Sequence, residues 1–331
     1  MASLGGVLRA LRIDGYLLAI LAAVVVALIW PAPAADGGIL HLDRITEAGI
    51  ALIFFSHGAA LDPRTLRAEA GKWRVHALIQ AMTFVVFPLL AFVIYKCSES
   101  WLPDEARIGF FFLGTLSSTI SSSIALTAVG RGNVPIAIFN ATVSGLLGLL
   151  ITPVLLGLII TVEGQPISVV QTFERIVVLL LLPLLLGQVL QGLIGSWVRS
   201  HKKGMGLLER AVIVLIVLST FSNATAAALW SHYDATVLLM IAVVVALLLG
   251  VVLWIGRGVS RQLGLPRADE VAFVFCGSTK SLANGAPIAK IVFGASPAAG
   301  MILLPLVFYH QLQLVVISML AKAYARKAAS E

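Results

Sequence analysis

The amino-acid sequence predicts an all-α, polytopic membrane protein with ten transmembrane helices arranged as two inverted five-helix repeats. The first observation behind this prediction is composition: of 331 residues, 59% are hydrophobic and only 12% are charged, and the mean hydropathy is +1.00. A soluble domain carries about 25% charged residues because water must solvate its surface. Most of this chain's surface is therefore expected to face lipid. The second observation is that polar stretches interrupt two apolar runs at corresponding places in the two halves.

The transmembrane helices are predicted from apolar runs, since about 20 mostly apolar residues cross a bilayer. The runs lie at 16–31, 43–61, 74–96, 107–129, 134–161, 174–197, 207–230, 235–256, 269–293 and 298–321. Arg9 and Arg12 precede the first run and small residues follow it, which is also the pattern of a signal peptide. We interpret this run as a transmembrane helix, because removing it would leave an odd number of spans and an incomplete first half.

Basic residues predict the orientation of the helices. Arg and Lys concentrate in alternate connections, and the remaining connections hold only Arg44, Lys96, Arg107 and Arg175. The positive-inside rule then places both termini in the cytoplasm. The same distribution explains the net charge of +7. It therefore argues against nucleic acid as a partner and for the lipid bilayer.

Five spans in each half, starting from opposite sides, form the pattern of inverted-topology repeats. The repeats are predicted at 1–161 and 162–331. A local similarity supports them: the run 111–118 reads FFLGTLSS and the run 274–281 reads VFCGSTKS. These runs fall in the fourth and ninth spans, so these two spans are expected to occupy equivalent positions.

Both similar stretches contain residues that weaken a helix. The fourth span is dense in hydroxyl groups, at Thr115, Ser117, Ser118, Thr119, Ser121, Ser122 and Ser123. The ninth span carries Gly277, Ser278, Thr279, Lys280, Ser281, Asn284, Gly285 and Pro287. Gly, Pro and competing Ser or Asn side chains all disfavour a continuous helix. Unwound backbone at membrane depth persists only where protein buries it or it lines a cavity. Two broken helices that cross near the midplane are therefore predicted to form a transport site. The alternative is that the hydroxyls only join helices or bond back to their own backbone.

Lys280 is the charge that falls at mid-depth in a predicted span, and no Asp or Glu does so. A charge there costs at least about 2.5–3.5 kcal/mol, so its presence implies a role. It is expected to bind an anionic substrate group, to take the place of a coupling cation, or to gain and lose a proton. The alternative is a lysine tethered to neighbouring carbonyls that holds the crossing together.

Other polar residues in the spans are candidates for the same site. His310 is either a proton-responsive group or a hydrogen-bonded core residue. Asn133, Asn140 and Thr142 supply neutral oxygens of the kind that hard cations bind, and Gln80 is expected to face the same cavity. A weak Na⁺ site is predicted near Ser122, Ser123 and Asn140.

An enzymatic function is not favoured by the sequence. It has no G-x-S-x-G, no H-E-x-x-H and no Walker loop, which are the motifs of the common hydrolases and nucleotide-binding enzymes. Cys97 and Cys276 lie far apart and form no metal or redox motif. No cofactor is expected other than Na⁺. Ser56 and His57, near the cytoplasmic end of the second span, are given no function by the sequence.

Several segments resemble the bile acid:sodium symporter superfamily. They are Arg131-Gly132-Asn133-Val134 after the Ser-rich helix, then Thr142-Val143-Ser144 and Leu150-Ile151-Thr152-Pro153. The stretches 54–59, 275–281 and 309–311 resemble its atypical branch, which includes bacterial transporters and a vertebrate orphan carrier. The resemblance covers essentially the whole chain. It implies a bacterial inner-membrane protein with a panel domain (spans 1, 2, 6 and 7) and a core domain (spans 3–5 and 8–10). It further implies secondary active transport of an organic anion by alternating access.

The sequence departs from the typical branch at its sodium ligands. Serines at Ser122 and Ser123 replace a Ser-Asn pair, and Ala137 and Ala141 stand where hydroxyls are expected. The glutamate of the ninth helix has no counterpart, and Lys280 lies in that region. Lys280 is therefore predicted to replace at least one sodium, which leaves weak Na⁺ coupling or proton coupling. The alternative function is a membrane regulator or scaffold in calcium homeostasis that transports no organic substrate.

Overall fold

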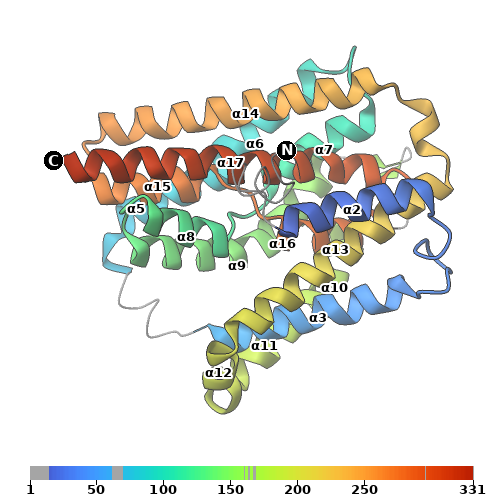
Figure 1. The fold of residues 1–331 in the computed structure, drawn as a ribbon, viewed down its shortest axis with the longest axis horizontal. Coiled ribbons are helices and arrows are strands. Elements are labelled where there is room, and N and C mark those ends of the chain that lie inside the picture. The colour runs from blue at the N-terminus through green and yellow to red at the C-terminus, as the bar shows by residue number, and fades with distance from the viewer. Residues whose placement is uncertain are drawn as a thin grey trace, which may run out of the picture.

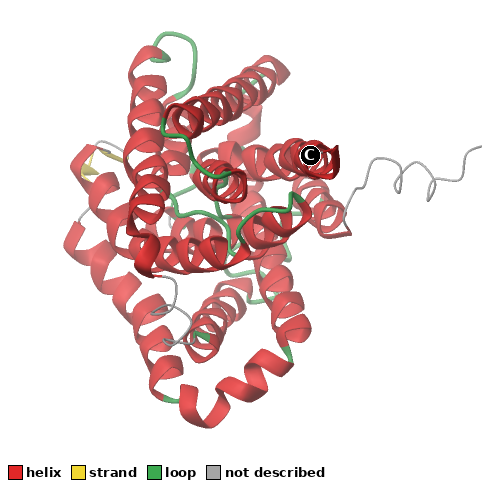
Figure 2. Ribbon diagram, turned by 90° about the vertical axis from the view of Figure 1, so that its left-hand side faces the viewer, coloured by secondary structure: helices red, strands yellow, loops and turns green. Residues whose placement is uncertain are grey.

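The computed structural model describes residues 15–61, 70–159, 161–162, 165–166, 169–294 and 296–330, so Arg9 and Arg12 lie outside the described residues. The described chain is helical apart from two short strands, β1 (Thr161–Val162) and β2 (Gln165–Pro166), which pair antiparallel. Figure 2 shows helices throughout, with this strand pair at one edge. The predicted helical class is confirmed.

Most helices follow the predicted apolar runs, but the run 174–197, predicted as one span, bends by 100° between Val189 and Gln191. In the first half they are α2 (Gly15–Ile29), α3 (Leu42–Ala60), η1 (Ala70–Lys72), α5 (Trp73–Ala81), η2 (Met82–Val86), α6 (Phe87–Cys97), α7 (Asp104–Thr115), α8 (Ser121–Val129) and α9 (Val134–Ile159). In the second half they are α10 (Val169–Ile176), η3 (Val177–Leu181), α11 (Leu182–Val189), α12 (Gln191–Ser200), α13 (Lys202–Ala226), η4 (Leu229–His232), α14 (Ala235–Gln262), α15 (Arg267–Ser278), α16 (Leu282–Phe293) and α17 (Ala299–Ser330).

The helices pack as two groups. The small group consists of α2, α3 and α10–α13, with α11, α12 and α13 packed on α3 and α2 packed on α13. The large group consists of α5–α9 and α14–α17, in which α7 packs on α6 and α17, and α15 packs on α14, α5, α8 and α9. Figure 1 shows α3, α11 and α12 set apart from α14 and α17, which run alongside each other. The groups meet where α13 contacts α16 and α17 and where α10 contacts α9.

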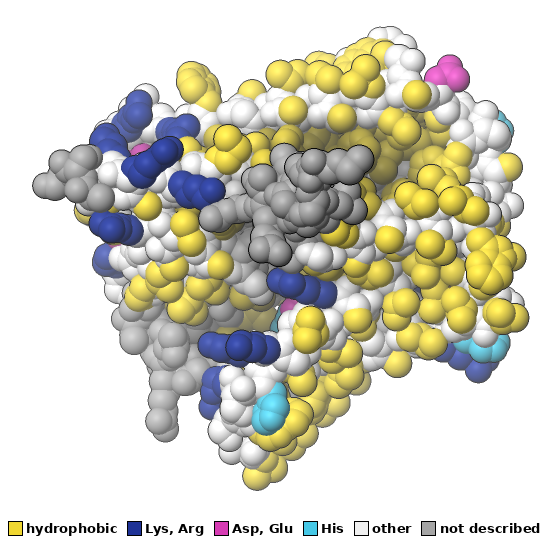
Figure 3. Space-filling model, in the orientation of Figure 1, with side chains coloured by type: hydrophobic (Ala, Val, Ile, Leu, Met, Phe, Trp, Pro, Cys, Tyr) yellow, Lys and Arg dark blue, Asp and Glu magenta, His cyan; other side chains and the backbone are white. Residues whose placement is uncertain are grey.

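Length and hydropathy identify several helices that can cross a membrane. Five described helical segments pass both criteria, and a sixth is added if a pair bent by 100° counts as one span. Large apolar side chains such as Leu193, Leu239 and Trp254 are exposed on the outside of the molecule. In Figure 3, hydrophobic side chains cover much of the visible face, and basic ones gather mainly toward the end with the C-terminus. The chain is a polytopic membrane protein, because lipid is the solvent that accepts such a surface.

The small group contains a very close contact between α3 and α11. A Cβ atom on Gly58 would lie 1.9 Å from the carbonyl oxygen of Leu184, and one on Gly187 would lie 2.0 Å from that of Phe55. Helices in membranes associate through such small residues, because they allow the two backbones to approach and pack. These glycines therefore fix the distance between α3 and α11.

A π-helical segment in the large group frees one backbone carbonyl. In η2 the hydrogen bonds span five residues, and the Phe87 N–H donates to the Met82 carbonyl. The next bond in this register would join residue 88 to the Thr83 carbonyl, but Pro88 has no N–H. The Thr83 carbonyl is thus left without a donor from its own helix.

Candidate functional site

Both predicted interruptions are present, and they contact each other. The first lies between Thr115 and Ser121, and the second lies between Ser278 and Leu282. The Ser281 N–H donates to the Ser117 carbonyl at 2.9 Å, although these residues belong to different halves of the chain. We call these two segments the first break (116–120) and the second break (279–281).

Three carbonyls at the end of α7, those of Gly114, Thr115 and Leu116, have donors from elsewhere in the chain. Helix ends leave their last carbonyls without helical partners, and buried ones must find others. The Lys280 Nζ donates to the Gly114 and Leu116 carbonyls at 2.7 and 2.6 Å. The Thr152 hydroxyl donates to the Thr115 carbonyl at 2.8 Å. The first break is therefore held by donors from α9 and from the second break.

Lys280 is fully buried and surrounded by backbone oxygen. Its third hydrogen bond goes to the Thr83 carbonyl at 3.0 Å, the one that Pro88 leaves free, and its Nζ lies 4.1 Å from the centre of the Phe87 ring. Three carbonyls match the three N–H donors of an ammonium group. The negative end of α7 and the face of the ring also favour a cation. The structure thus tethers Lys280 to carbonyls, in the arrangement that a small bound cation would take.

Side chains of α17 hold the second break. The Gln313 amide accepts from the Lys280 N–H and donates to the Lys280 carbonyl, both at 2.8 Å. The Tyr309 hydroxyl donates to the Ser278 carbonyl at 2.7 Å. His310 Nδ1 lies 2.9 Å from Gln313 Nε2, so this histidine sits in the buried network. No role was predicted for Gln313. Its amide side chain within a mostly apolar run was the feature that could have indicated a buried hydrogen-bonding role.

The hydroxyls of the Ser-rich stretch mostly bond to one another. Ser118 Oγ and Ser123 Oγ lie 2.8 and 3.1 Å from Thr279 Oγ1, which joins the two breaks. Ser122 Oγ donates to Thr119 Oγ1 at 2.6 Å. No carboxylate is among the partners that these five side chains have in the described structure. The cluster therefore offers neutral oxygens only.

Two of the three predicted asparagines, Asn133 and Asn140, belong to separate hydrogen-bond groups. Asn140 Nδ2 lies 2.7 Å from His76 Nδ1, and Gln80 Nε2 donates to Asn140 Oδ1 at 3.0 Å. Asn133 Nδ2 donates to Asp269 Oδ1 at 2.7 Å, and the same carboxylate pairs with Lys72. The hydrogen bonds of Asn140 thus run to α5, and those of Asn133 run to the start of α15.

A cavity of about 500 Å³ lies between the two groups of helices. The small group lines it with α3, α11, α12 and α13, and the large group lines it with α8, α9 and α16. Its walls are mostly apolar. Three of the predicted site residues, Ser121, Thr142 and Asn284, line it and come from three different helices. Asn284 Nδ2 also donates to Ser117 Oγ at 2.8 Å, which connects the cavity wall to the first break.

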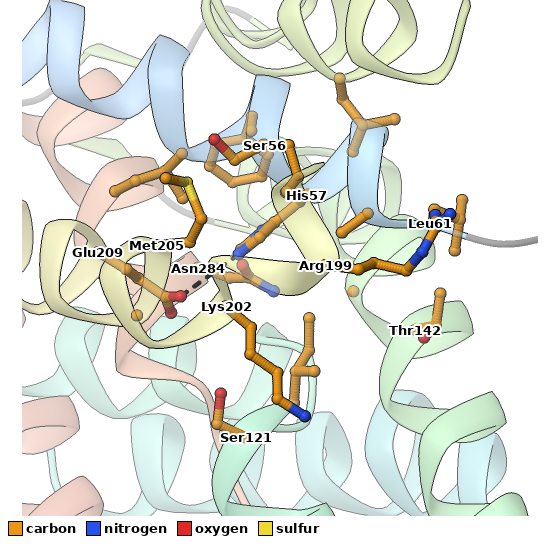
Figure 4. Close-up of a pocket in the computed structure, with 18 of the residues that line it drawn as sticks. Ser56, His57, Leu61, Ser121, Thr142, Arg199, Lys202, Met205, Glu209 and Asn284 are labelled. Carbon is orange, nitrogen blue, oxygen red and sulfur yellow. Dashed lines mark hydrogen bonds and ion pairs between the residues drawn. The ribbon is translucent and has the colours of Figure 1, made fainter. Parts of the chain in front are cut away.

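Four ionisable side chains face this cavity from the small group. They are His57 on α3, Arg199 on α12, and Lys202 and Glu209 on α13. Figure 4 shows His57 directed at Glu209, and Lys202 extending toward the side that Ser121 lines. Roles for Arg199, Lys202 and Glu209 in a binding site were not predicted, because charges near the ends of spans usually indicate orientation only.

Comparison with known proteins identifies the family. The family model described as SBF-like CPA transporter family matches residues 14–326. The chain belongs to this transporter family. An uncharacterised protein of Pseudomonas aeruginosa is 38% identical over 95% of this chain and 93% of its own length. The Escherichia coli protein YfeH, described as a proposed symporter, is 37% identical over 95% and 94%. The rat protein named sodium/bile acid cotransporter 7 is 27% identical over 95% and 93%.

Family membership confirms the resemblance seen in the sequence and supports a membrane transporter. A transporter family also implies a function without catalysis. Two features of the structure are candidates for the transport site of such a protein. One is the contact of the two breaks around Lys280, and the other is the cavity that adjoins this contact at Asn284.

Proposed function

We propose that this protein is a secondary active transporter that carries an organic anion by alternating access. The observation that carries the proposal is the cavity of about 500 Å³ between the two helix groups. A volume in this range holds a small organic molecule. The cavity extends from the breaks to the end of the small group that bears Arg199 and Lys202, so a ligand there contacts both groups at once.

The lining favours an anion with an apolar body. Arg199 and Lys202 outnumber the single carboxylate of Glu209, so the cavity carries net positive charge when His57 is neutral. The remaining wall is dominated by Ile, Leu, Phe and Ala side chains, with hydroxyl and amide groups from the large group. Basic groups at the mouth of an apolar cavity attract anions and orient them.

We further assign the small group as the panel domain and the large group as the core domain, in a ten-span bacterial inner-membrane protein with cytoplasmic termini. The assignment groups α5 with α6, α7 with α8, α10 with α11, and α15 with α16 as single spans. It is supported by the match between helix bounds and apolar runs, and by the contact of the two breaks, as inverted repeats at 1–161 and 162–331 require.

The opposite end of the domain boundary is closed by polar contacts. Lys290 Nζ on α16 lies 3.4 Å from Asp36 Oδ1 and 3.5 Å from Ser219 Oγ on α13. The Asp36 N–H in turn donates to Asn223 Oδ1 at 2.7 Å. We therefore assign the structure to an inward-facing state, in which Lys290 and Asp36 hold the outer side shut.

Breaking this contact is expected to open the outer side more often. In a Cys97→Ser background, Ser219→Cys reports access from that side to a membrane-impermeant maleimide. A partly exposed ion pair contributes up to about 1 kcal/mol, so Lys290→Ala should raise the labelling rate about three- to fivefold. Exchanging the charges, with Lys290→Asp and Asp36→Lys together, should restore slow labelling. An unchanged rate in Lys290→Ala would contradict the role of this contact.

Lys280 is proposed to take the place of a coupling cation. Its ammonium occupies a ring of three carbonyls at the breaks, and it does not line the cavity. The nearby hydroxyl cluster lacks a carboxylate, which hard cations usually require. Transport is then driven either by weak Na⁺ binding near Ser122, Ser123 and Asn140 or by proton coupling. Both alternatives are part of the proposal.

Ligand-dependent thermal unfolding of the protein in lipid nanodiscs tests the proposed function. Organic anions would be screened with and without Na⁺, beginning with taurocholate, since vertebrate relatives are named for bile acids. A ligand at a hundredfold excess over its Kd stabilises the folded state by about 2.7 kcal/mol. No stabilisation by any organic anion, with or without Na⁺, would contradict an organic-anion transporter.

Variants at Gly145 test whether the ligand binds in the cavity. This glycine lines the cavity, and the nearest atoms to a Cβ there would be 3.7 and 3.9 Å away. Gly145→Ala should therefore keep the ligand-induced shift, whereas Gly145→Leu should fill the cavity and remove the shift without lowering the ligand-free unfolding midpoint. If Gly145→Leu still binds like the wild type, the anion binds elsewhere.

A further inference from the structure

His57 and Glu209 form a pair of titratable groups in the cavity. His57 Nε2 lies 3.4 Å from Glu209 Oε2, and the two side chains keep 27% and 21% of their surface exposed. Both line the cavity. Water therefore reaches the pair, and so do protons. His57 and Glu209 lie on α3 and α13, both in the small group, so the pair does not hold the small group to the large one.

The charged groups around this pair come from few elements. Arg199 on α12 and Lys202 at the start of α13 line the same cavity. Glu209 also acts electrostatically on His310 of α17, and Arg210 lies over the ring of Tyr16 on α2. The segments α11 and η3, which pack on α3, and α8 and α9, which line the cavity, contribute no ionisable side chain in their described sequence. Among the described residues that line the cavity, Glu209 thus supplies the carboxylate and His57 supplies the imidazole.

We propose that the His57–Glu209 pair is the proton-binding site that couples a proton to the organic anion in this cavity. The inference rests on the proposed function, because the anion must bind beside the pair. His57 Nε2 and Glu209 Oε2 are close enough to share one proton in a hydrogen bond. Binding one proton removes the negative charge of the pair, so repulsion of the anion by Glu209 is cancelled.

Coupling follows from this change of charge. With the pair deprotonated, Arg199, Lys202 and Glu209 leave one net positive charge in the lining, and protonation leaves two. The anion then binds more tightly when the pair holds a proton. By thermodynamic linkage, the bound anion favours protonation to the same extent. A proton and an anion therefore enter the cavity together and leave together, as symport requires.

The test measures taurocholate binding to the full-length protein in nanodiscs at pH 5.5 and pH 8.0. The sulfonate of taurocholate stays ionised across this range, so any pH dependence comes from the protein. Wild-type affinity should rise about tenfold from pH 8.0 to pH 5.5, within the usual range of site-to-site coupling. In weakly buffered solution with an indicator dye, about half a proton should be taken up per anion bound near neutral pH, which is the most that a tenfold change in affinity allows by linkage.

Variants separate this site from other titrating groups. Glu209→Gln should bind taurocholate more tightly than the wild type at pH 8.0, with a smaller pH dependence because its repulsive carboxylate is gone. His57→Gln should bind with no more than a twofold pH dependence and should take up no proton. His232→Gln changes an exposed histidine outside the cavity lining and should retain the wild-type profile.

The outcomes distinguish this proposal from the proposed function. Wild-type binding that does not change with pH, or a tenfold pH dependence that persists in both His57→Gln and Glu209→Gln, overturns the proton site and leaves the anion cavity intact. If neither taurocholate nor any other organic anion of the screen binds at either pH, both are overturned.

Discussion

The Lys280→Ala variant is expected to become a protein whose stability depends on Na⁺. Removing the ammonium leaves the Thr83, Gly114 and Leu116 carbonyls buried without their donor. Orphaned buried polar groups and a cavity together cost about 3 kcal/mol or more. The vacated space is ringed by carbonyl oxygens, which are ligands for a small hard cation. Na⁺ that binds only the folded state should then recover part of the lost stability.

The measurement is the thermal unfolding midpoint in nanodiscs with NaCl or with choline chloride at equal ionic strength. Lys280→Ala should unfold well below the wild type in choline and regain several degrees in Na⁺, whereas the wild type should differ much less between the two salts. Lys280→Met is the matched control, because its side chain fills the same space without donors. It should be destabilised in both salts. A Lys280→Ala variant that is equally stable in both salts would rule out a cation position at the breaks.

Gly58→Ala is expected to prevent correct packing of the small group. The added Cβ would lie 1.9 Å from the Leu184 carbonyl oxygen, and that oxygen is part of the α11 backbone, so no side-chain rotation relieves the overlap. Overpacking usually costs about 1–3 kcal/mol, and displacing a whole helix should exceed that range. Because α3 and α11 both line the cavity, ligand binding should be lost with the packing.

Size-exclusion profiles and unfolding midpoints after detergent extraction measure this effect. Gly58→Ala and Gly187→Ala should each give aggregated protein or a strongly lowered midpoint. Gly192→Ala and Gly250→Ala are suitable controls, since a Cβ at either position meets nothing within 4 Å. A monodisperse Gly58→Ala protein with the wild-type midpoint would mean that α3 and α11 do not pack as closely as the structure places them.

Hydropathy and residue type were sufficient to predict most helical elements and the two interruptions at the breaks, but not the bend of 100° within the run 174–197. The run 107–129 became α7 and α8, and the run 269–293 became α15 and α16, with the breaks where Ser, Gly and Asn accumulate. These are local properties: a segment is apolar over the length of a bilayer, or it contains residues that weaken a helix. The position of Lys280 within a break was likewise evident from its place in the second stretch.

The partners of these residues were decided only by the tertiary structure. Lys280 bonds to carbonyls from α7 and from η2, each more than a hundred and sixty positions away in the sequence. Backbone carbonyls carry no sequence signature, so no pattern could name them. The sequence places four ionisable residues near the ends of spans, and only the packing of α3, α12 and α13 brings them to the lining of one cavity: His57, Arg199, Lys202 and Glu209.

The sequence by itself therefore determined which segments enter the membrane and where two of them break, because solvation is a local property of the chain. Only the folded structure decided what the breaks bind and which side chains face the cavity, because those contacts depend on how distant helices pack.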